Sequence, residues 1–204
     1  MIPNVTTIDA HPDVGRHGGL AWLIAGYVGA AGFLVLEAFI RKAGDASSLK
    51  ASGDDEGTSR VLIVASAVAA GLPVALRRVP VRSLPRAAAP LGLALQGSGL
   101  VLRIAAMRTL GAYYTRTLKA DQAQPVVDAG PYSMVRHPGY AGALLIWGGL
   151  GLAARSAPAS ALVTGLMFGA YRRRIVSEEK LLLRALPTYH SYCQRTDRLI
   201  PHVW

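Results

Sequence analysis

The amino-acid sequence predicts an all-α, polytopic integral membrane protein with about five transmembrane helices and a cytosolic C-terminal helical segment. Three observations support this fold class. Of the 204 residues 51% are hydrophobic, only 17% are charged, and the charges collect in short segments between long apolar runs. Because hydrocarbon tolerates few ionised groups, this distribution is typical of a membrane-embedded chain and not of a soluble domain of this size.

Five apolar runs are candidates for membrane helices, for which a full span needs about 20 residues. They cover residues 19–40, 61–76, 87–107, 140–154 and 157–171. The second run contains Gly71 and Pro73, so we expect it to be kinked or tilted. Arg103 lies near the end of the third run, where we expect its long side chain to snorkel to the interface.

The fourth and fifth runs are short for full spans, and only Arg155 and Ser156 separate them. We interpret them as a tightly turned helical hairpin; a buried core helix and a re-entrant segment are the alternatives for runs of this length. In the fifth run, Gly165 and Gly169 form a small-xxx-small pair, which predicts close packing against another helix.

Basic residues give the chain a formal net charge of +10, and they lie mainly beside the apolar runs. This placement indicates membrane topology under the positive-inside rule, and it excludes nucleic acid as the expected partner. Most basic residues follow the first, third and fifth runs, which predicts an outside N-terminus and a cytosolic C-terminus. The arginines around Pro80 and Pro85 oppose this orientation. We expect a multi-pass protein of the cytoplasmic membrane with lipids as partners; the sequence does not fix the oligomeric state.

Metal and thiol chemistry are not expected. Cys193 is the only cysteine, so the chain has no intrachain disulfide and no thiol metal cluster. The histidines lack zinc-site spacing and cysteine partners, and a catalytic metal is therefore not predicted; they are His11, His17, His137, His190 and His202.

Two segments place polar groups where apolar ones would cost less. In the first, residues 130–142, Pro138 disfavours a helical conformation at His137 and suits the first position of the helix that follows. The positive end of that helix, with Arg136 and His137 as donors, predicts a site for an anionic group such as a ligand carboxylate. The alternative is an interfacial anchor of aromatic and arginine side chains.

The second segment follows the fifth apolar run and is predicted to be a helix that leaves the membrane. Arg174 and Glu178 are four residues apart and share a face. Glu179 falls on the apolar stripe of the same helix, where a carboxylate is costly unless it is paired or binds something. The alternative is a solvated pair of glutamates flanked by basic residues.

Together these segments resemble the isoprenylcysteine carboxyl methyltransferase family and the related bacterial and phospholipid methyltransferases. The pattern is Gly-Pro-Tyr-x-x-Val-Arg-His-Pro-x-Tyr-x-Gly from residue 130, two membrane segments, Arg-x-x-x-Glu-Glu from residue 174, and a Tyr-x-x-Tyr tail at Tyr189 and Tyr192 that ends near Ile200-Pro201. The resemblance covers about residues 108–204. It divides the chain into three divergent membrane helices, residues 1–107, and a methyltransferase-like catalytic region, residues 108–204.

The resemblance implies an S-adenosylmethionine-dependent methyltransferase whose cofactor site faces the cytosol. Carried over by position, it implies that Glu178 and Glu179 close a cofactor site lined by Tyr132, Val135, His137, Pro138, Tyr140 and Gly142. It also implies that Arg174, with Arg136 or Arg198, faces the substrate or its developing charge.

The methyl acceptor is left open. A carboxylate is already ionised and needs positioning by arginine more than it needs a base, whereas an amine, thiol or hydroxyl would need Glu178 or Glu179 as the base. We expect a lipophilic acceptor, a small molecule or a prenylated substrate, for which the carboxylate of an isoprenylcysteine-like compound is one candidate. The alternatives are an NADPH-dependent membrane reductase of the sterol type, which ends in a similar Arg-His-Pro-x-Tyr string, and a non-catalytic membrane scaffold.

Overall fold

The computed structural model describes residues 14–43, 57–79, 83–111 and 125–204. Its helices are α1 (Val14–Ala43), α2 (Thr58–Ala75), α3 (Ala88–Leu110), α4 (Pro138–Ala153), α5 (Ala157–Ala185) and α6 (Tyr189–Arg195), with short 3₁₀ helices at Leu76–Arg78 and Gly130–Ser133. The described residues form no strand, only two isolated β-bridges. The predicted all-α class is confirmed.

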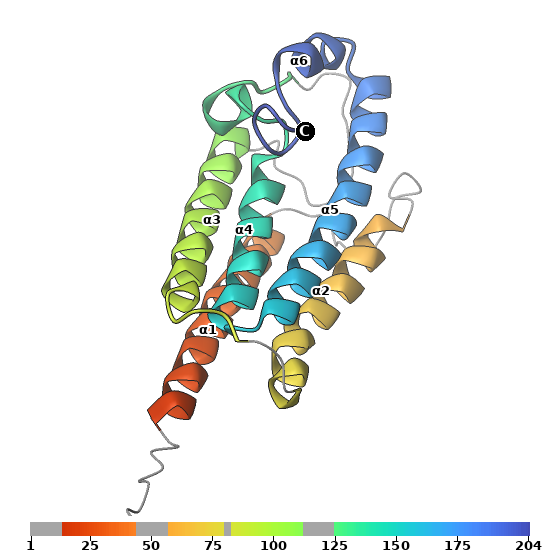
Figure 1. Cartoon of the computed structure of the whole chain (residues 1–204). Helices are drawn as coiled ribbons and strands as arrows, with labels where there is room; N and C mark the ends of the chain where they lie inside the picture. The colour runs from red at the N-terminus through yellow and green to blue at the C-terminus, as the bar shows by residue number, and fades with distance from the viewer. Residues whose placement is uncertain (1–13, 44–56, 80–82, 112–124) are drawn as a thin grey trace, which may run out of the picture.

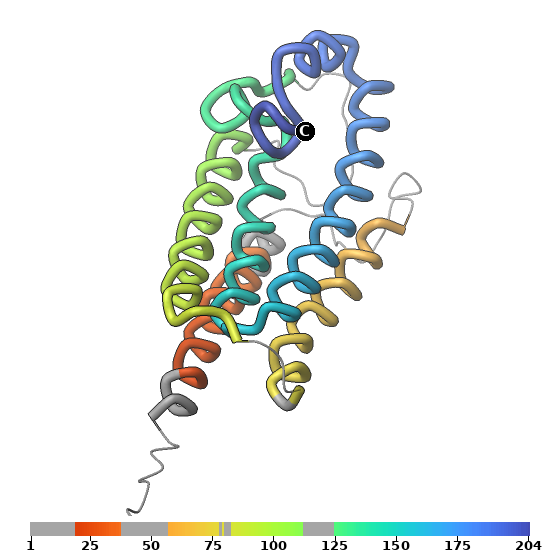
Figure 2. Tube along the Cα trace, in the orientation of Figure 1, coloured from red at the N-terminus to blue at the C-terminus, as the bar shows by residue number. Residues whose placement is uncertain are grey.

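The five long helices lie side by side in a bundle and alternate in direction along the chain (Figure 1). Helix α4 is central and packs against α1, α3 and α5, while α2 packs against α5. The alternation brings three parts of the chain to one end of the bundle: the start of α4, the end of α5, and α6 with the residues after it (Figure 2). Both polar segments singled out in the sequence therefore lie at the same end.

Three helices are long and apolar enough to cross a membrane by length and composition, over Gly19–Glu37, Thr58–Ala75 and Ala88–Leu110. Helix α4 is a shorter apolar helix of 16 residues, about 24 Å long. Helix α5 has 29 residues, of which the first half is apolar and the second half carries the charges from Arg172 onward. The protein is thus a polytopic membrane protein, as predicted.

The short fourth and fifth runs form the expected helical hairpin. Helix α4 ends at Ala153 and α5 begins at Ala157, where the Ser156 hydroxyl accepts a hydrogen bond from the Ala159 N–H at 3.3 Å. At this turn the Arg155 guanidinium donates to the Leu84 carbonyl, with Nη2 at 3.0 Å. The segment before α3 is thereby fixed to the hairpin at the end of the bundle away from the polar segments.

Close packing occurs between α3 and α4 and not at the predicted glycine pair. A Cβ on Gly99 would lie 2.4 Å from the Gly142 carbonyl oxygen, and one on Gly92 would lie 2.5 Å from that of Gly149. Only glycine permits this approach of two helix backbones. By contrast, a Cβ on Gly165 or Gly169 would meet no described atom within 4 Å, so the prediction for that pair was wrong.

The expectation that Arg103 snorkels was also wrong. Its side chain is buried and lies between helices, where Nε donates to Glu37 Oε1 of α1 at 2.6 Å and Nη1 donates to the Gly139 carbonyl of α4 at 2.7 Å. The guanidinium also stacks over Phe33, 5.1 Å from the ring centroid. A nearby carboxylate makes burial less costly than reaching for the interface, because the two charges neutralise each other.

Candidate functional site

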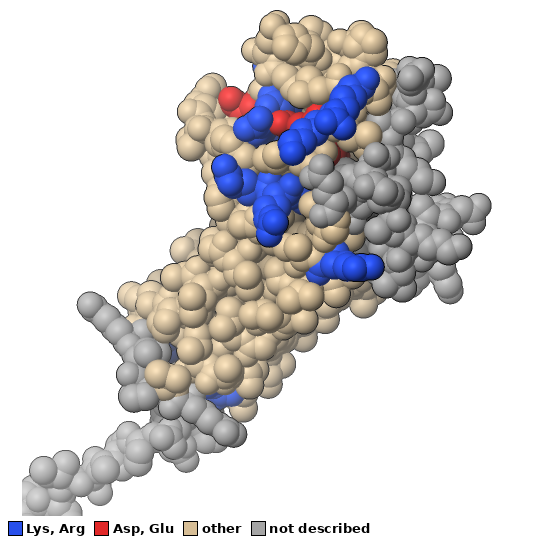
Figure 3. Space-filling model, turned by 90° about the vertical axis from the view of Figure 1, so that its right-hand side faces the viewer, with Lys and Arg blue, Asp and Glu red and all other residues tan. Residues whose placement is uncertain are grey.

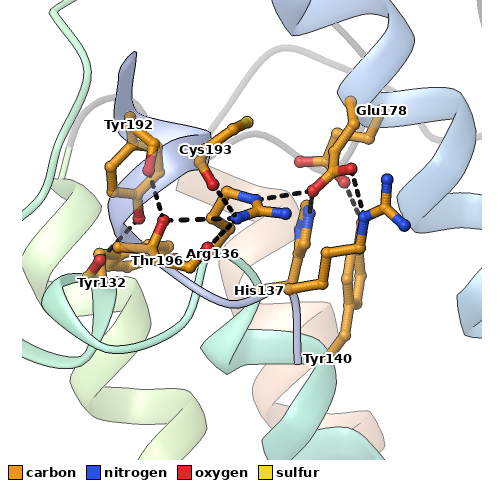
Figure 4. Close-up of polar contacts among 10 residues, drawn as sticks. Tyr132, Arg136, His137, Tyr140, Glu178, Tyr192, Cys193 and Thr196 are labelled. Atoms are coloured by element: carbon orange, nitrogen blue, oxygen red, sulfur yellow. Dashed lines mark hydrogen bonds and ion pairs between the residues drawn. The ribbon is translucent and has the colours of Figure 1, made fainter. Parts of the chain in front are cut away.

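The two polar segments meet through side chains at one end of the bundle (Figure 4). His137 is the N-cap of α4 and has a non-helical backbone, with φ −124° and ψ 53°, as its position before Pro138 requires. The C-terminal tail runs beside this turn: the Arg136 N–H donates to the Asp197 carbonyl at 2.8 Å, and the His137 N–H donates to the Arg198 carbonyl at 3.0 Å. The tail thereby fixes the backbone that presents Arg136 and His137.

Glu179 of α5 is the centre of this arrangement. Its Oε1 lies 2.8 Å from Arg136 Nε and 3.2 Å from His137 Nε2, and its Oε2 accepts from Arg198 Nε at 2.7 Å. Glu179 is only 4% exposed. The anion predicted to bind Arg136 and His137 is therefore the chain's own carboxylate, and the alternative of a solvated glutamate pair is wrong for Glu179.

Electrostatics favour the ionised form of this carboxylate. Burial raises the pKa of Glu179, but hydrogen bonds from His137 and Arg136 together with their charges outweigh burial and lower the pKa to about 2. Burial lowers the pKa of Arg136, but the hydrogen bond to Glu179 and the charge of Glu179 outweigh burial and raise this pKa. At neutral pH, Glu179 and Arg136 are thus a buried ion pair. A second guanidinium, that of Arg198, pairs with Glu179 from the more exposed side of the cluster.

Arg136 also holds the end of α6. Its Nη1 donates to the Cys193 carbonyl at 3.1 Å and to the Thr196 carbonyl. Nε and Nη1 of this guanidinium are therefore both used by the protein itself. Burial raises the pKa of the Cys193 thiol, so this cysteine has no sign of an activated nucleophile.

Glu178 differs from its neighbour Glu179. It is partly exposed, and its Oε2 accepts a hydrogen bond from the Tyr140 hydroxyl at 2.7 Å. Within the described part of the chain, Tyr140 is its only hydrogen-bond partner. The Tyr140 ring in turn stacks on His137, with centroids 5.7 Å apart, and lies 5.3 Å from the Tyr171 ring. One Glu178 oxygen thus faces the aromatic group at the start of α4, and the other oxygen remains able to accept a further donor.

Arg174 lies one helical turn before Glu178 and is 3% exposed. Its Nη1 donates to the hydroxyls of Thr58, at 2.8 Å, and Ser59, at 3.1 Å, in the first turn of α2. No local sequence pattern singles out these two hydroxyl groups, since α2 and Arg174 are distant in sequence. Arg174 therefore links α2 to the part of α5 that carries the glutamates.

Tyr132, Val135 and Pro138, which were also predicted to line the site, are buried next to it. Tyr132 and Val135 are buried; the Tyr132 carbonyl accepts from the Tyr192 hydroxyl at 2.7 Å, and Val135 forms a parallel bridge with Asp197. Burial raises the pKa of Tyr192 to about 12, so its hydroxyl remains a donor at neutral pH. Pro138 is buried at the first position of α4.

Gly142 is predicted to line a cofactor site, but the space beside it is occupied by α3. A Cβ on Gly142 would lie 2.5 Å from the Gly99 carbonyl oxygen and 3.1 Å from the Arg103 N–H nitrogen. The packing of α4 against α3 thus explains the glycine at position 142. Arg136, His137 and Tyr140 of the same segment contact the two glutamates instead.

Comparison with known proteins supports the relation suggested by the motifs. The family model described as "Isoprenylcysteine carboxyl methyltransferase (ICMT) family" matches residues 92–184, from within α3 to near the end of α5. No curated protein matches the chain. The matched segment contains Arg136, His137, Glu178 and Glu179, while Arg198 and the tail tyrosines lie beyond it. Over residues 92–184 the chain therefore matches the isoprenylcysteine carboxyl methyltransferase family, as the motifs suggested.

Proposed function

We propose that this membrane protein transfers a methyl group from S-adenosylmethionine to a lipophilic acceptor at the end of the bundle that carries Glu178 and Glu179. The observation that carries the proposal is the contact between the two motifs. Glu179 binds Arg136 and His137, and Glu178 binds Tyr140, although the partners are 38 to 43 positions apart in the sequence. A scaffold has no need to bring two carboxylates and these donors together at one end of the membrane.

The residues fit a ligand that carries an ammonium group and ribose hydroxyls. Glu178 has one oxygen that accepts from Tyr140, and it can accept from such a ligand with the other. Glu179 is already held on both oxygens, so its part is to fix Arg136, His137 and Arg198 in place. When bound, S-adenosylmethionine supplies a methyl group on a sulfonium, which leaves as a neutral thioether after transfer to a nucleophile.

Arg198 is the best candidate among the three predicted arginines for holding an acceptor carboxylate. Arg136 uses Nε and Nη1 inside the protein and its side chain is buried, and Arg174 is buried against α2. The Arg198 side chain is 39% exposed and donates to Glu179 through Nε. Its terminal nitrogens can then form a two-point contact with a carboxylate and hold it in line with the methyl group, so proximity and orientation supply the rate enhancement.

We place this site on the cytosolic side of the cytoplasmic membrane. The basic side chains support this orientation: Figure 3 shows Lys and Arg gathered near the end of the bundle with the site, and a flank below it that is nearly without charge. Cytosolic segments of membrane proteins carry the excess of Lys and Arg. A lipophilic acceptor would reach the site from the bilayer.

Calorimetric titration of the detergent-purified protein with S-adenosylhomocysteine, beside NADPH as a control ligand, tests the proposal. We expect heat of binding for S-adenosylhomocysteine and none for NADPH. Binding of NADPH alone would support the reductase instead. A folded protein that binds neither ligand would support the non-catalytic membrane scaffold. Transfer of labelled methyl groups to an N-acylated S-prenylcysteine, with the corresponding methyl ester as a blocked control, then tests the carboxylate acceptor.

A further inference from the structure

Residues 199–204 fold back against α5 beside the polar cluster. The N–H groups of Leu199 and Ile200 donate to the Trp204 carbonyl at 2.7 and 3.0 Å, which closes a turn. The Trp204 ring packs on Phe168 of α5, with ring centroids 5.8 Å apart, and the Arg198 guanidinium lies over the same ring, 5.6 Å from its centroid. Trp204 therefore touches both the apolar part of α5 and a residue that pairs with Glu179.

The contact with Phe168 gives the level of Trp204 relative to a bilayer. Phe168 is a partly exposed residue in the last turn of the apolar half of α5, and the exposed Arg172 and Arg173 follow directly. A change from apolar to basic residues along a membrane helix marks the boundary between hydrocarbon and headgroups. Tryptophan is enriched at this boundary because its ring is apolar and its N–H is polar.

Two other side chains of the same turn, those of Ile200 and Val203, are apolar and exposed. Val203 is 74% exposed and Ile200 is 46% exposed, and the adjoining Met134, whose carbonyl accepts from the Asp197 N–H, is 62% exposed. Such a group of apolar side chains is unfavourable in water but suited to the boundary between headgroups and acyl chains. The position of Trp204 beside a membrane helix points to lipid as the partner of this surface.

We propose that residues 199–204 form an interfacial anchor in which Trp204 and Val203 insert into the headgroup boundary of the bilayer. The anchor holds Arg198, which stacks on Trp204, against Glu179 at 2.7 Å. Contact of Trp204 with lipid would therefore help to keep the ion pair between Arg198 and Glu179 in place. This inference is independent of the methyl-transfer activity, since it concerns only the tail, the bilayer and an ion pair.

Fluorescence quenching by brominated lipids tests the anchor in the full chain. The protein is reconstituted into vesicles of phosphatidylcholine and phosphatidylglycerol that carry bromine either near the headgroup or near the bilayer centre. The chain has three tryptophans, so the difference between wild type and Trp204→Phe isolates the emission of Trp204. We expect this emission to be quenched about twofold or more strongly by the shallow bromines than by the deep ones. Emission that aqueous iodide quenches and that no brominated lipid affects would overturn the proposal.

A matched pair of substitutions at Val203 provides the second test. Val203→Asp introduces a charge where the anchor enters the bilayer, and we expect the shallow quenching of Trp204 to fall about twofold or more. Val203→Leu keeps the side chain apolar and should retain wild-type quenching. Equal quenching in the two variants, with far-ultraviolet circular dichroism that shows both to be folded, would contradict insertion of this segment. Loss of quenching only when a second protein is added would assign the surface to a protein partner.

Discussion

Two buried charge clusters among the described residues differ in composition and in what they connect. Within the bundle, Glu37 pairs with Arg103, and Arg103 also binds the Gly139 carbonyl. At the end of the bundle, the single carboxylate of Glu179 binds Arg136, His137 and Arg198. Among the described side chains, the first cluster pairs Glu37 with Arg103 and joins helices. The second has more positive groups than negative ones, which suits a place where a further anion binds.

The two clusters have different roles: the first positions helices, and the second forms the candidate site. The Glu37–Arg103 pair sets the position of the first turn of α4 relative to α1 and α3, because Arg103 also binds the Gly139 carbonyl. The cluster around Glu179 is built on that turn, since His137 caps α4 and Tyr140 lies in its first turn. Substitutions in the two clusters should therefore differ in their effect on stability and on ligand binding.

Loss of the Glu179 charge should have the largest effect on stability. Glu179→Gln leaves the buried Arg136 without its counter-charge, and we expect the free energy of unfolding to fall by about 4 kcal/mol. Thermal unfolding in detergent measures this. The neighbouring Glu178→Gln is the matched control, and we expect a loss of no more than about 1 kcal/mol, because that glutamate has one partner and is partly exposed. Equal losses in the two variants would refute the central position of Glu179.

Acid should weaken the same cluster in a defined range of pH. The folded pKa of Glu179 is about 2, against an ordinary value of 4.5, so its stabilisation is complete above about pH 4.5 and is lost as pH falls towards 2. A shift of this size corresponds to about 3 kcal/mol. Unfolding followed across this range should show a wild-type slope that Glu179→Gln lacks. A variant that keeps the full slope would show that other carboxylates cause it.

Breaking the pair within the bundle should have a smaller effect. Arg103→Met leaves Glu37 without this partner, and we expect a loss of about 2 kcal/mol, since polar contacts in membranes are worth less than burial alone suggests. The double variant Arg103→Met with Glu37→Leu should regain part of the stability, because both charges of this ion pair are then removed together. A double variant as unstable as the sum of the single ones would argue against direct coupling.

The smallest of these stability effects concerns the backbone contact between α3 and α4. Gly99→Ala adds a Cβ 2.4 Å from the Gly142 carbonyl oxygen, and we expect a loss of about 1 to 2 kcal/mol as the helices separate. Gly97→Ala is the matched control two residues away, where an added Cβ meets no described atom within 4 Å. Thermal unfolding should separate the two alanines, and similar melting temperatures would show that the helices can shift freely.

Much of the fold could be predicted from the distribution of apolar runs, because membrane helices require long stretches without charge. The hairpin of α4 and α5 followed from two short runs separated by two residues. The close contact of α3 and α4 was missed: Gly92 and Gly99 are two helical turns apart, as are Gly142 and Gly149, but such spacing does not show which helix lies opposite. Gly165 and Gly169 have the small-xxx-small spacing, but no described helix packs closely against them.

The site was predicted less completely, and for a related reason. The motifs identified Arg136, His137, Glu178 and Glu179, and the apolar stripe correctly indicated that Glu179 is buried. The pattern could not show that one glutamate is held on both oxygens while the next has one hydrogen-bonded oxygen, since this depends on a rotation of about 100° around α5. Contacts from the tail to the start of α4 are made by backbone groups, which leave no signal in side-chain types.

Titration of Glu178→Gln with S-adenosylhomocysteine, beside the wild type, tests the central claim most directly. The account assigns Glu178 to the ligand and Glu179 to the protein, so this variant should unfold close to the wild-type temperature and bind S-adenosylhomocysteine about tenfold more weakly. Weaker binding with unchanged stability would confirm that the two motifs meet to form a cofactor site. Unchanged affinity in a folded Glu178→Gln protein, with a wild type that binds, would contradict the account.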